Sequence, residues 1–206
     1  MEHNHTHERR FQGNADRLRS PERIERLEVR NVVTMSLQGL AAASVLDVGT
    51  GTGLFAEAFA AAGAAVTGID TNVDLLALAR QHVPAGEFRE ALAEMLPFAA
   101  GSFDLVFFGV VLHETDDPLA ALMEARRVAR QRVAVLEWPY RDEPHGPPLA
   151  HRLSPERIND LASRAGFSTV QRLQLTHVET NGRQSIAWIQ AAHPPPGARP
   201  LAATVS

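Results

Sequence analysis

A glycine-rich turn between a buried strand and a helix is the feature that most restricts how this chain folds. Val45-Leu46-Asp47-Val48 has the apolar character of a buried strand. It is followed by Gly49-Thr50-Gly51-Thr52-Gly53 and by an alanine-rich helix expected over Phe55–Ala62. Glycines at alternate positions permit a tight turn and let a ligand approach the main chain closely. The turn therefore predicts a ligand site at the carboxyl edge of a sheet.

The segments after the turn alternate short apolar runs with amphipathic helices, which is typical of βαβ units with right-handed crossovers. Hydrophobic periodicity and helix start signals predict strands over Ala65–Ile69, Glu87–Arg89, Phe103–Phe108 and Arg132–Glu137, and helices over 73–82, 117–129 and 154–166. Two later strands, Phe167–Leu175 and Ser185–Gln190, flank Asn181-Gly182, a hairpin signal. The expected fold class is α/β: a Rossmann-like three-layer sandwich with a mostly parallel seven-stranded sheet that ends in an antiparallel hairpin.

The region before the first strand has its own helix start. Ser20-Pro21-Glu22 places a Ser N-cap, a first-turn Pro and an acid in succession, and apolar positions continue the helix to about Gly39. We therefore expect three parts: an N-terminal segment with a lid-like helix over 1–40, a ligand-binding domain over 41–192, and a disordered proline-rich tail over 193–206.

Composition excludes several classes of function. The chain has 206 residues, no cysteine and a formal net charge of −4, so disulfides, a thiolate nucleophile and Cys-based metal sites are excluded. No Lys/Arg block and no membrane-length apolar run occurs. We expect a cytoplasmic protein, monomeric or homodimeric, with a small-molecule partner and neither nucleic acid nor membrane. His3, His5 and His7 alternate, but a polar terminus explains them and no metal site is expected.

Two ligands compete for the glycine turn. A dinucleotide fingerprint needs a small residue where this chain has Leu54, and Asp47, two residues before the first glycine, would repel a pyrophosphate. The same acid suits a cationic ligand such as S-adenosylmethionine. Asp70 ends the second strand, 19 residues after Gly51, where a carboxylate can accept ribose hydroxyls. Adenosylmethionine is favoured over a nucleotide-dependent oxidoreductase.

These motifs resemble those of class I S-adenosylmethionine-dependent methyltransferases, specifically the small-molecule branch of the ubiquinone/menaquinone-biosynthesis C-methyltransferases. The resemblance runs from about Val45 to Arg127. Besides the turn, it is carried by Gly68-Ile69-Asp70, Ala93-Glu94-Met95-Leu96-Pro97-Phe98, Gly101-Ser102-Phe103-Asp104-Leu105-Val106 and Val111-Leu112-His113-Glu114-Thr115-Asp116-Asp117-Pro118.

The resemblance implies a set of cofactor-binding residues. They are Asp47, Gly49, Thr50, Gly51 and Gly53 at the methionine portion, Asp70 for the ribose with Thr71 beside it, Ala93 and Glu94 beside the adenine, and Gly109 and Leu112 after the fourth strand. One departure concerns Leu92, which stands where the family usually has an Asp for the adenine amino group. That contact is lost here, or a backbone group or Glu90 supplies it.

Methyl transfer from a sulfonium is an in-line displacement, so a base is needed only when the nucleophile carries a proton. Position at the sheet edge makes His113, Glu137 and Tyr140 the candidate catalytic residues, with Trp138 as an aromatic wall. The proline-containing loop 141–151 is a candidate wall of the acceptor pocket. The acceptor atom stays open, and a non-catalytic adenosylmethionine-binding sensor or partner subunit is the alternative function.

Overall fold

The computed structural model describes residues 13–41, 43–168, 171–172, 175–179 and 182–192. Its strands are β1 (Ser44–Val48), β2 (Ala65–Asp70), β3 (Glu87–Glu90), β4 (Phe103–Gly109), β5 (Ala129–Glu137), β6 (Gln171–Arg172), β7 (Leu175–Glu179) and β8 (Gly182–Ala192). Its α-helices are α1 (Pro21–Arg26), α2 (Val29–Leu37), α3 (Leu54–Ala61), α4 (Val73–His82), α5 (Pro118–Val128) and α6 (Pro155–Arg164). Three short 3-10 helices add η1 (Ala15–Arg19), η2 (Leu112–Glu114) and η3 (Leu149–His151).

Five parallel strands form the centre of the sheet in the order β3-β2-β1-β4-β5. In register, Val45 of β1 lies between Val66 of β2 and Leu105 of β4. The backbone of β8 pairs antiparallel with β5, and β6 and β7 each pair antiparallel with β8. The chain adds β2 and β3 on one side of β1 and then β4 and β5 on the other side, so the strand order reverses at β1. Ligands in such sheets bind at this switch point, outside the carboxyl ends of the strands.

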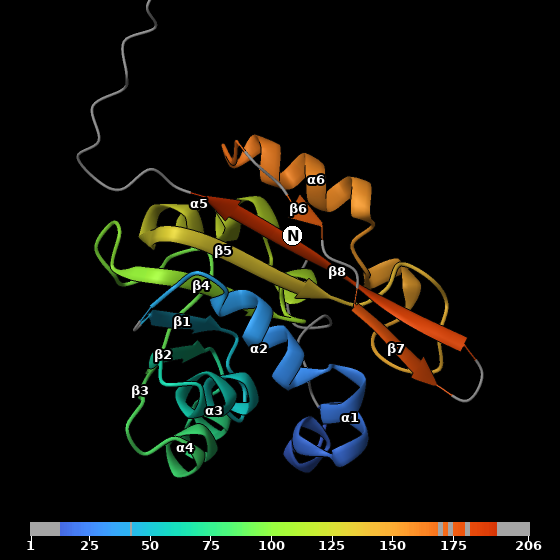
Figure 1. Ribbon diagram of the computed structural model, residues 1–206, viewed down its shortest axis with the longest axis horizontal. Helices are drawn as coiled ribbons and strands as arrows, with labels where there is room; N and C mark the ends of the chain where they lie inside the picture. Colours follow the sequence, from blue (N-terminus) through green and yellow to red (C-terminus); the bar gives the residue numbers. More distant parts are fainter. Residues whose placement is uncertain (1–12, 42, 169–170, 173–174, 180–181, 193–206) are drawn as a thin grey trace, which may run out of the picture.

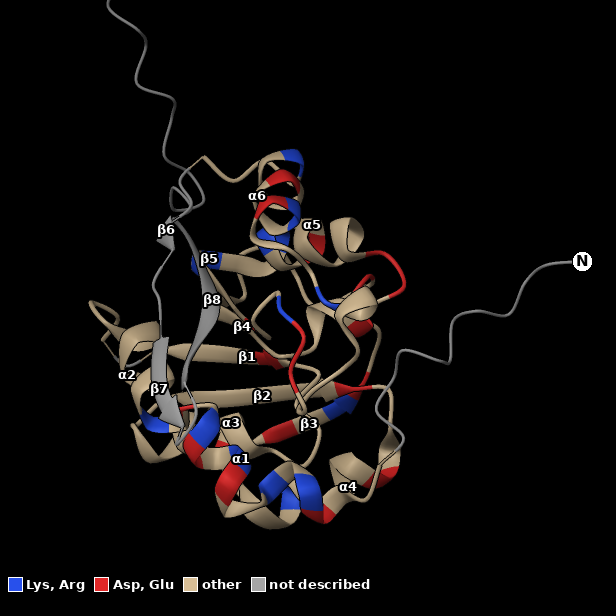
Figure 2. Cartoon of the chain, turned by 90° about the vertical axis from the view of Figure 1, so that its right-hand side faces the viewer, with Lys and Arg blue, Asp and Glu red and all other residues tan. Residues whose placement is uncertain are grey.

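Two hydrophobic cores make the molecule three-layered (Figure 1). On one face of the sheet α2, α3 and α4 pack around Phe59 and Phe107, and on the other α5 and α6 pack around Phe108 and Leu122. Figure 2 shows the sheet from the side, with the charges of β1 and β2 confined to their ends. The predicted Rossmann-like α/β fold with a parallel sheet is confirmed.

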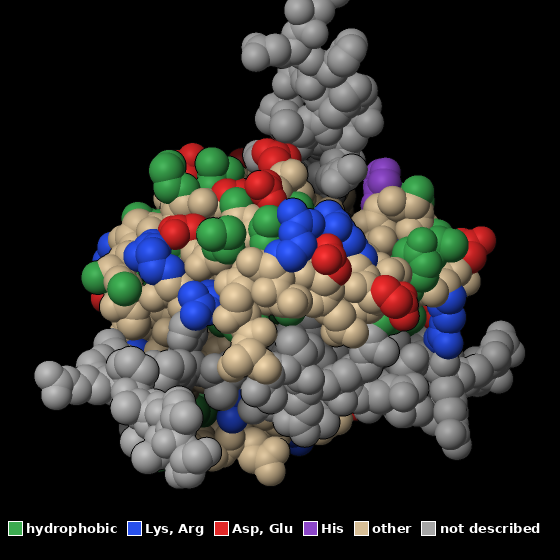
Figure 3. Space-filling model, turned by 90° about the horizontal axis from the view of Figure 1, so that it is seen from above, with side chains coloured by type: hydrophobic (Ala, Val, Ile, Leu, Met, Phe, Trp, Pro, Cys, Tyr) green, Lys and Arg blue, Asp and Glu red, His purple; other side chains and the backbone are tan. Residues whose placement is uncertain are grey.

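Seen from above, Arg, Asp and Glu side chains are interspersed with hydrophobic ones (Figure 3). On α6, for example, Asp160 pairs with both Arg157 and Arg164. Exposed pairs of this kind contribute little to stability. In the part of the chain that the structure describes, no helix is long and apolar enough to cross a membrane.

The single helix expected over residues 21–39 is wrong, because the structure divides it into α1 and α2 at Leu27 and Glu28. Glu28 adopts a left-handed conformation, φ +47°. Leu27 and Val29 are both buried in the same core. Residues two apart lie on nearly opposite faces of a continuous helix, so burying both requires the chain to change direction between them.

The C-terminal region differs from the expected seven strands. The described residues contain eight, because the segment expected as one strand over 167–175 supplies both β6 and the first residue of β7. Positions 180 and 181 of the expected turn lie outside the described residues, as do the expected tail over 193–206 and the N-terminal histidines.

Candidate active site

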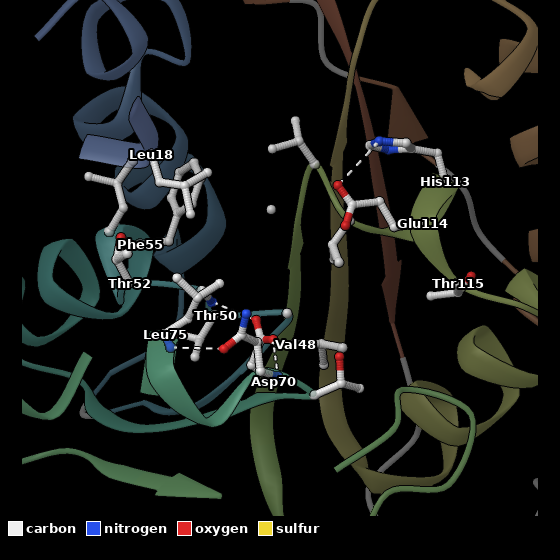
Figure 4. Close-up of a pocket in the computed structure, with 18 of the residues that line it drawn as sticks. Leu18, Val48, Thr50, Thr52, Phe55, Asp70, Leu75, His113, Glu114 and Thr115 are labelled. Carbon is white, nitrogen blue, oxygen red and sulfur yellow. Dashed lines mark hydrogen bonds and ion pairs between the residues drawn. The ribbon is translucent and has the colours of Figure 1, made fainter. Parts of the chain in front are cut away.

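The glycine turn is tied to the neighbouring strand by hydrogen bonds. The amide of Thr50 donates to the carbonyl of Ile69 at 2.8 Å, and the amide of Gly51 donates to Oδ2 of Asp70 at 2.8 Å. The other oxygen of Asp70, Oδ1, accepts from the amide of Asn72 at 2.9 Å. Asp70 thus joins the turn after β1 to the start of α4, and Figure 4 shows it beside Thr50 at the cavity.

The three glycines of the turn have different neighbours, although all adopt positive φ. A Cβ on Gly49 would lie 2.3 Å from Cγ2 of Val111, and one on Gly53 would lie 3.1 Å from Cα of Ala79 in α4. A Cβ on Gly51 would meet only Leu18, at 3.6 Å. The absence of a side chain at Gly49 therefore lets the loop after β4 pack against the turn, and at Gly53 it lets α3 approach α4. At Gly51 it leaves the backbone open to a ligand.

A cavity of about 1030 Å³ lies along the carboxyl ends of β1, β2, β4 and β5. Of the residues expected to bind the cofactor, those that line it are Asp47, Gly49, Thr50, Gly51, Asp70, Thr71, Ala93, Glu94 and Gly109. Gly53 and Leu112 are buried behind the wall, and Val110 and Val111 face the cavity instead. Ligand pockets usually measure about 300–1,000 Å³, so this cavity lies at the upper end of the usual range.

Asp47 is a buried acid, 2% exposed, at the cavity wall. Burial raises its pKa to about 7, and the charge of Asp70 acts in the same direction, while the hydrogen bond from Thr50 Oγ1 to Asp47 Oδ2 (2.7 Å) opposes the shift. A cation bound nearby would favour the carboxylate and lower that pKa.

We expect adenosylhomocysteine to bind more tightly as pH rises through 7, because its ammonium group favours the ionised form of Asp47. Between about pH 6 and pH 8 the association constant should increase about tenfold and then level off. Asp47→Asn, which keeps a hydrogen-bond acceptor for Thr50, should bind more weakly at about pH 8 and show a flat profile. Calorimetric titration across this range measures both, and an equally steep profile in Asp47→Asn would contradict the assignment.

The expected adenine end of the cavity lacks the family's usual acid. Leu92 is 40% exposed and lines the cavity. Glu90, the substitute considered from the sequence, is not among the described lining residues, whereas Glu94 is. Oε1 of Glu94 accepts from the amides of Asp116 (2.8 Å) and Asp117 (3.2 Å). Glu94 therefore fixes the loop before α5 at this end of the cavity.

His113 and Glu137, proposed separately from the sequence, form a buried pair. Nδ1 of His113 lies 2.8 Å from Oε2 of Glu137, and the amide of His113 donates to Oε1 at 3.0 Å. The two residues are 4% and 0% exposed. On the other side of the ring, Nε2 faces Oε1 of Glu114 at 3.7 Å (Figure 4). Burial lowers the pKa of His113, but the charges of Glu137 and Glu114 outweigh it, so the pKa lies above its ordinary value.

Two further chain segments line the cavity, and the first of them contacts the glycine turn. Arg17 and Leu18 of η1 and Arg23 and Arg26 of α1 line it from one side. The segment is held in place because Arg19 pairs with Glu57 of α3 and its Nη1 donates to the carbonyl of Thr52 at 3.2 Å. Pro144–Pro148 and His151 line the cavity from the other side, beside Trp138.

Sequence reasoning missed two arginines, and it placed Tyr140 nearer the site than the structure does. Arg152 is buried and donates to the carbonyls of Pro139 and Arg141 (2.9 Å each) and Pro147 (2.8 Å), which shapes the loop. Arg23 lines the cavity from the covering helix α1. Tyr140 is 51% exposed and lies outside the described lining residues. No sequence motif identifies either arginine, because the residues that each one contacts come close to it only in the folded chain.

The fold and this cavity define a Rossmann-like domain with a ligand site at the carboxyl edge of its parallel sheet. Residues 46–136 match the model of the Methyltransf_11 family, described as a methyltransferase domain. The match spans less than half of the chain, and it confirms the resemblance inferred from the motifs.

Relatives and solved structures agree with this. A demethylmenaquinone methyltransferase of Chlorobaculum parvum is 41% identical over 87 residues, 42% of this chain and 36% of its own length. A ubiquinone biosynthesis O-methyltransferase of Pseudomonas paraeruginosa is 39% identical over 97 residues, 45% and 42% of the two chains. The chain thus spans about two fifths of these relatives' length. A SAM-dependent methyltransferase from Aquifex aeolicus shares the fold, with TM-score 0.70, 21% identity and coverage of 88% and 99%.

Proposed function

We propose that this protein is an S-adenosylmethionine-dependent methyltransferase that transfers a methyl group to a small-molecule acceptor by in-line displacement. The observation that carries the proposal is the hydrogen bond between the Gly51 amide and Asp70 at the edge of the cavity. It places an open backbone and a carboxylate side by side where β1 and β2 end. The relatives, which are named as a demethylmenaquinone methyltransferase and a ubiquinone biosynthesis O-methyltransferase, support the same class of reaction.

The residues present fit the cofactor. Gly51 leaves its backbone clear, and Thr52 Oγ1, buried at the cavity wall, has no hydrogen-bond partner among the described residues. Asp47 can carry the negative charge that an ammonium or sulfonium group favours. The bound cofactor would supply an electrophilic methyl group. The chain's own part is to orient the acceptor and to exclude water, which the covering segments η1, α1 and 144–148 support.

His113 is the proposed general base for an acceptor that carries a proton. Because Nδ1 is held by Glu137, its proton stays on that nitrogen and Nε2 is left to accept one. The methyl group would pass from sulfur to the acceptor, the sulfur keeping the bonding electron pair, and the acceptor proton would pass to Nε2. Glu137 orients the ring. Tyr140 is not part of this proposal, because it is not among the described residues that line the cavity.

Calorimetry with adenosylhomocysteine tests the cofactor site. We expect micromolar-scale binding to the wild-type chain, and Asp70→Ala should weaken it about 100-fold, since a lost charge-assisted hydrogen bond and a loosened turn act together. Asp74→Ala is the matched control, because Asp74 is a nearby exposed acid on α4 that does not line the cavity.

Transfer of labelled methyl to a panel of small metabolites then tests catalysis. Binding of NAD in preference to adenosylhomocysteine would overturn the proposal at its first step. Binding of the cofactor with no labelled product over the whole panel would favour a sensor or partner subunit.

A further inference from the structure

A cationic side chain of the covering helix α1 lines the cavity and has no ion-pair partner among the described residues. Arg23 of α1 lines the cavity and is half-buried. Its Nε is buried and has no hydrogen-bond partner among the described residues. Burial lowers its pKa to about 10, which still leaves the guanidinium charged at neutral pH. A buried guanidinium nitrogen without a partner is unfavourable unless a ligand satisfies it.

The surroundings hold this guanidinium in place without neutralising it. Its Cζ lies 5.7 Å from the centroid of the Trp138 ring, and the Cζ of Arg152 lies 5.9 Å from that ring. Glu114 attracts Arg23 electrostatically but also faces Nε2 of His113 at 3.7 Å, while Arg26 repels it. Arg26 and Arg17 add positive charge at the same cavity wall. The field on this side therefore favours an anion.

The position of Arg23 separates it from the predicted adenosine half of the cavity. That half is formed by the ends of β1 and β2, with Asp70 and Leu92. Arg23 instead faces Trp138, which follows β5, and is influenced by Glu114, which follows β4. Its planar guanidinium offers two parallel donors, the geometry that pairs best with a carboxylate.

We propose that the methyl acceptor of this enzyme carries a carboxylate or a similar planar anionic group, bound by Arg23 above the Trp138 ring. This proposal rests on the function proposed above and names its substrate class. An aryl or small aliphatic acid fits: the anion pairs with Arg23, and the apolar body lies against Trp138 and the proline-rich loop. The nucleophilic atom then faces His113.

The test uses the full chain with two probes of equal shape, benzoate and benzamide, titrated by calorimetry or ligand-observed NMR with and without saturating adenosylhomocysteine. We expect the wild-type protein to prefer benzoate by about tenfold, the effect of one charge-assisted pair. Arg23→Gln should abolish this preference and Arg23→Lys should retain part of it. Arg30→Gln, an exposed arginine of α2 that does not line the cavity, should retain all of it.

A second pair of ligands separates the acceptor anion from the carboxylate of the cofactor itself. Adenosylhomocysteine carries that carboxylate and methylthioadenosine lacks it. We expect Arg23→Gln to bind both as tightly as the wild type. A loss confined to adenosylhomocysteine would overturn the proposal and assign Arg23 to the cofactor.

The other outcomes are equally decisive. Equal binding of benzoate and benzamide to the wild type, undetectable binding included, would overturn the acceptor proposal, as would a preference that survives in Arg23→Gln. Failure of the wild type to bind adenosylhomocysteine or methylthioadenosine would instead count against the proposed function. The titrations without cofactor report the preference for an anion in either case.

Discussion

Gly49→Ala is expected to destabilise the protein by about 3 kcal/mol and to abolish adenosylhomocysteine binding. Gly49 has φ +66°, and its new Cβ would lie 2.3 Å from Cγ2 and 2.9 Å from Cβ of Val111. Val111 cannot easily move away, because the amide of the preceding residue, Val110, donates a hydrogen bond to the carbonyl of Leu136 at 2.7 Å. Val110 itself adopts φ +56°, a rare conformation for a β-branched residue. The substitution therefore forces apart the two loops that border the cavity.

Gly63→Ala is the matched control, since Gly63 has φ +88° but nothing lies within 4 Å of its Cβ position. Gly63→Ala should lower the free energy of unfolding by only about 1 kcal/mol, because alanine is strained in a left-handed backbone conformation, and it should leave binding intact. The double variant Gly49→Ala/Val111→Ala should recover the part of the loss that comes from the collision. Urea unfolding and calorimetry measure both effects. Equal losses in Gly49→Ala and Gly63→Ala would show that the contact with Val111 is unimportant.

The cofactor half of the site could be predicted because its determinants are local in sequence. Asp47, Gly49 and Gly51 lie within five residues, and Asp70 ends the next strand, so strand periodicity alone brings them to one edge. His113 and Glu137 also follow from position, since each stands near the end of one of two adjacent parallel strands. The hydrogen bond between them could not be predicted, because the sequence does not show that β4 and β5 are neighbours in the assembled sheet.

The acceptor half could not be predicted, because it depends on contacts between distant segments. Arg23 reaches Trp138 only because the chain changes direction at Glu28, a change that comes from burying both Leu27 and Val29. Arg152 shapes the loop through backbone carbonyls, which carry no side-chain signature in the sequence. The sequence pattern therefore predicts functional groups at a strand end more readily than it predicts the cavity walls that determine which substrate binds.

Glu137→Gln is expected to lower the pKa of His113, and in the proposed reaction to slow methyl transfer by about 10²–10⁴-fold for an acceptor that carries a proton. In the wild type the charges of Glu137 and Glu114 outweigh burial and the repulsion from Arg152, which raises the pKa. A base must be unprotonated, so the rate should rise with pH through this raised pKa. Without the Glu137 charge, burial dominates, and the acidic limb of the profile should move to lower pH.

NMR titration of the His113 ring in the wild type, Glu137→Gln and Glu114→Gln measures the pKa without any acceptor. Glu114→Gln is the graded control: Glu114 faces Nε2 at 3.7 Å, against 2.8 Å between Glu137 and Nδ1, so its smaller effect should lower the pKa less. Because Glu137 also accepts from the amides of His113 and Trp138, a stability measurement must accompany each titration. An unchanged His113 pKa in folded Glu137→Gln would refute the electrostatic role of the pair. A lowered pKa with an unchanged rate profile would leave Glu137 as a structural anchor of the β4 and β5 ends and remove His113 as the base.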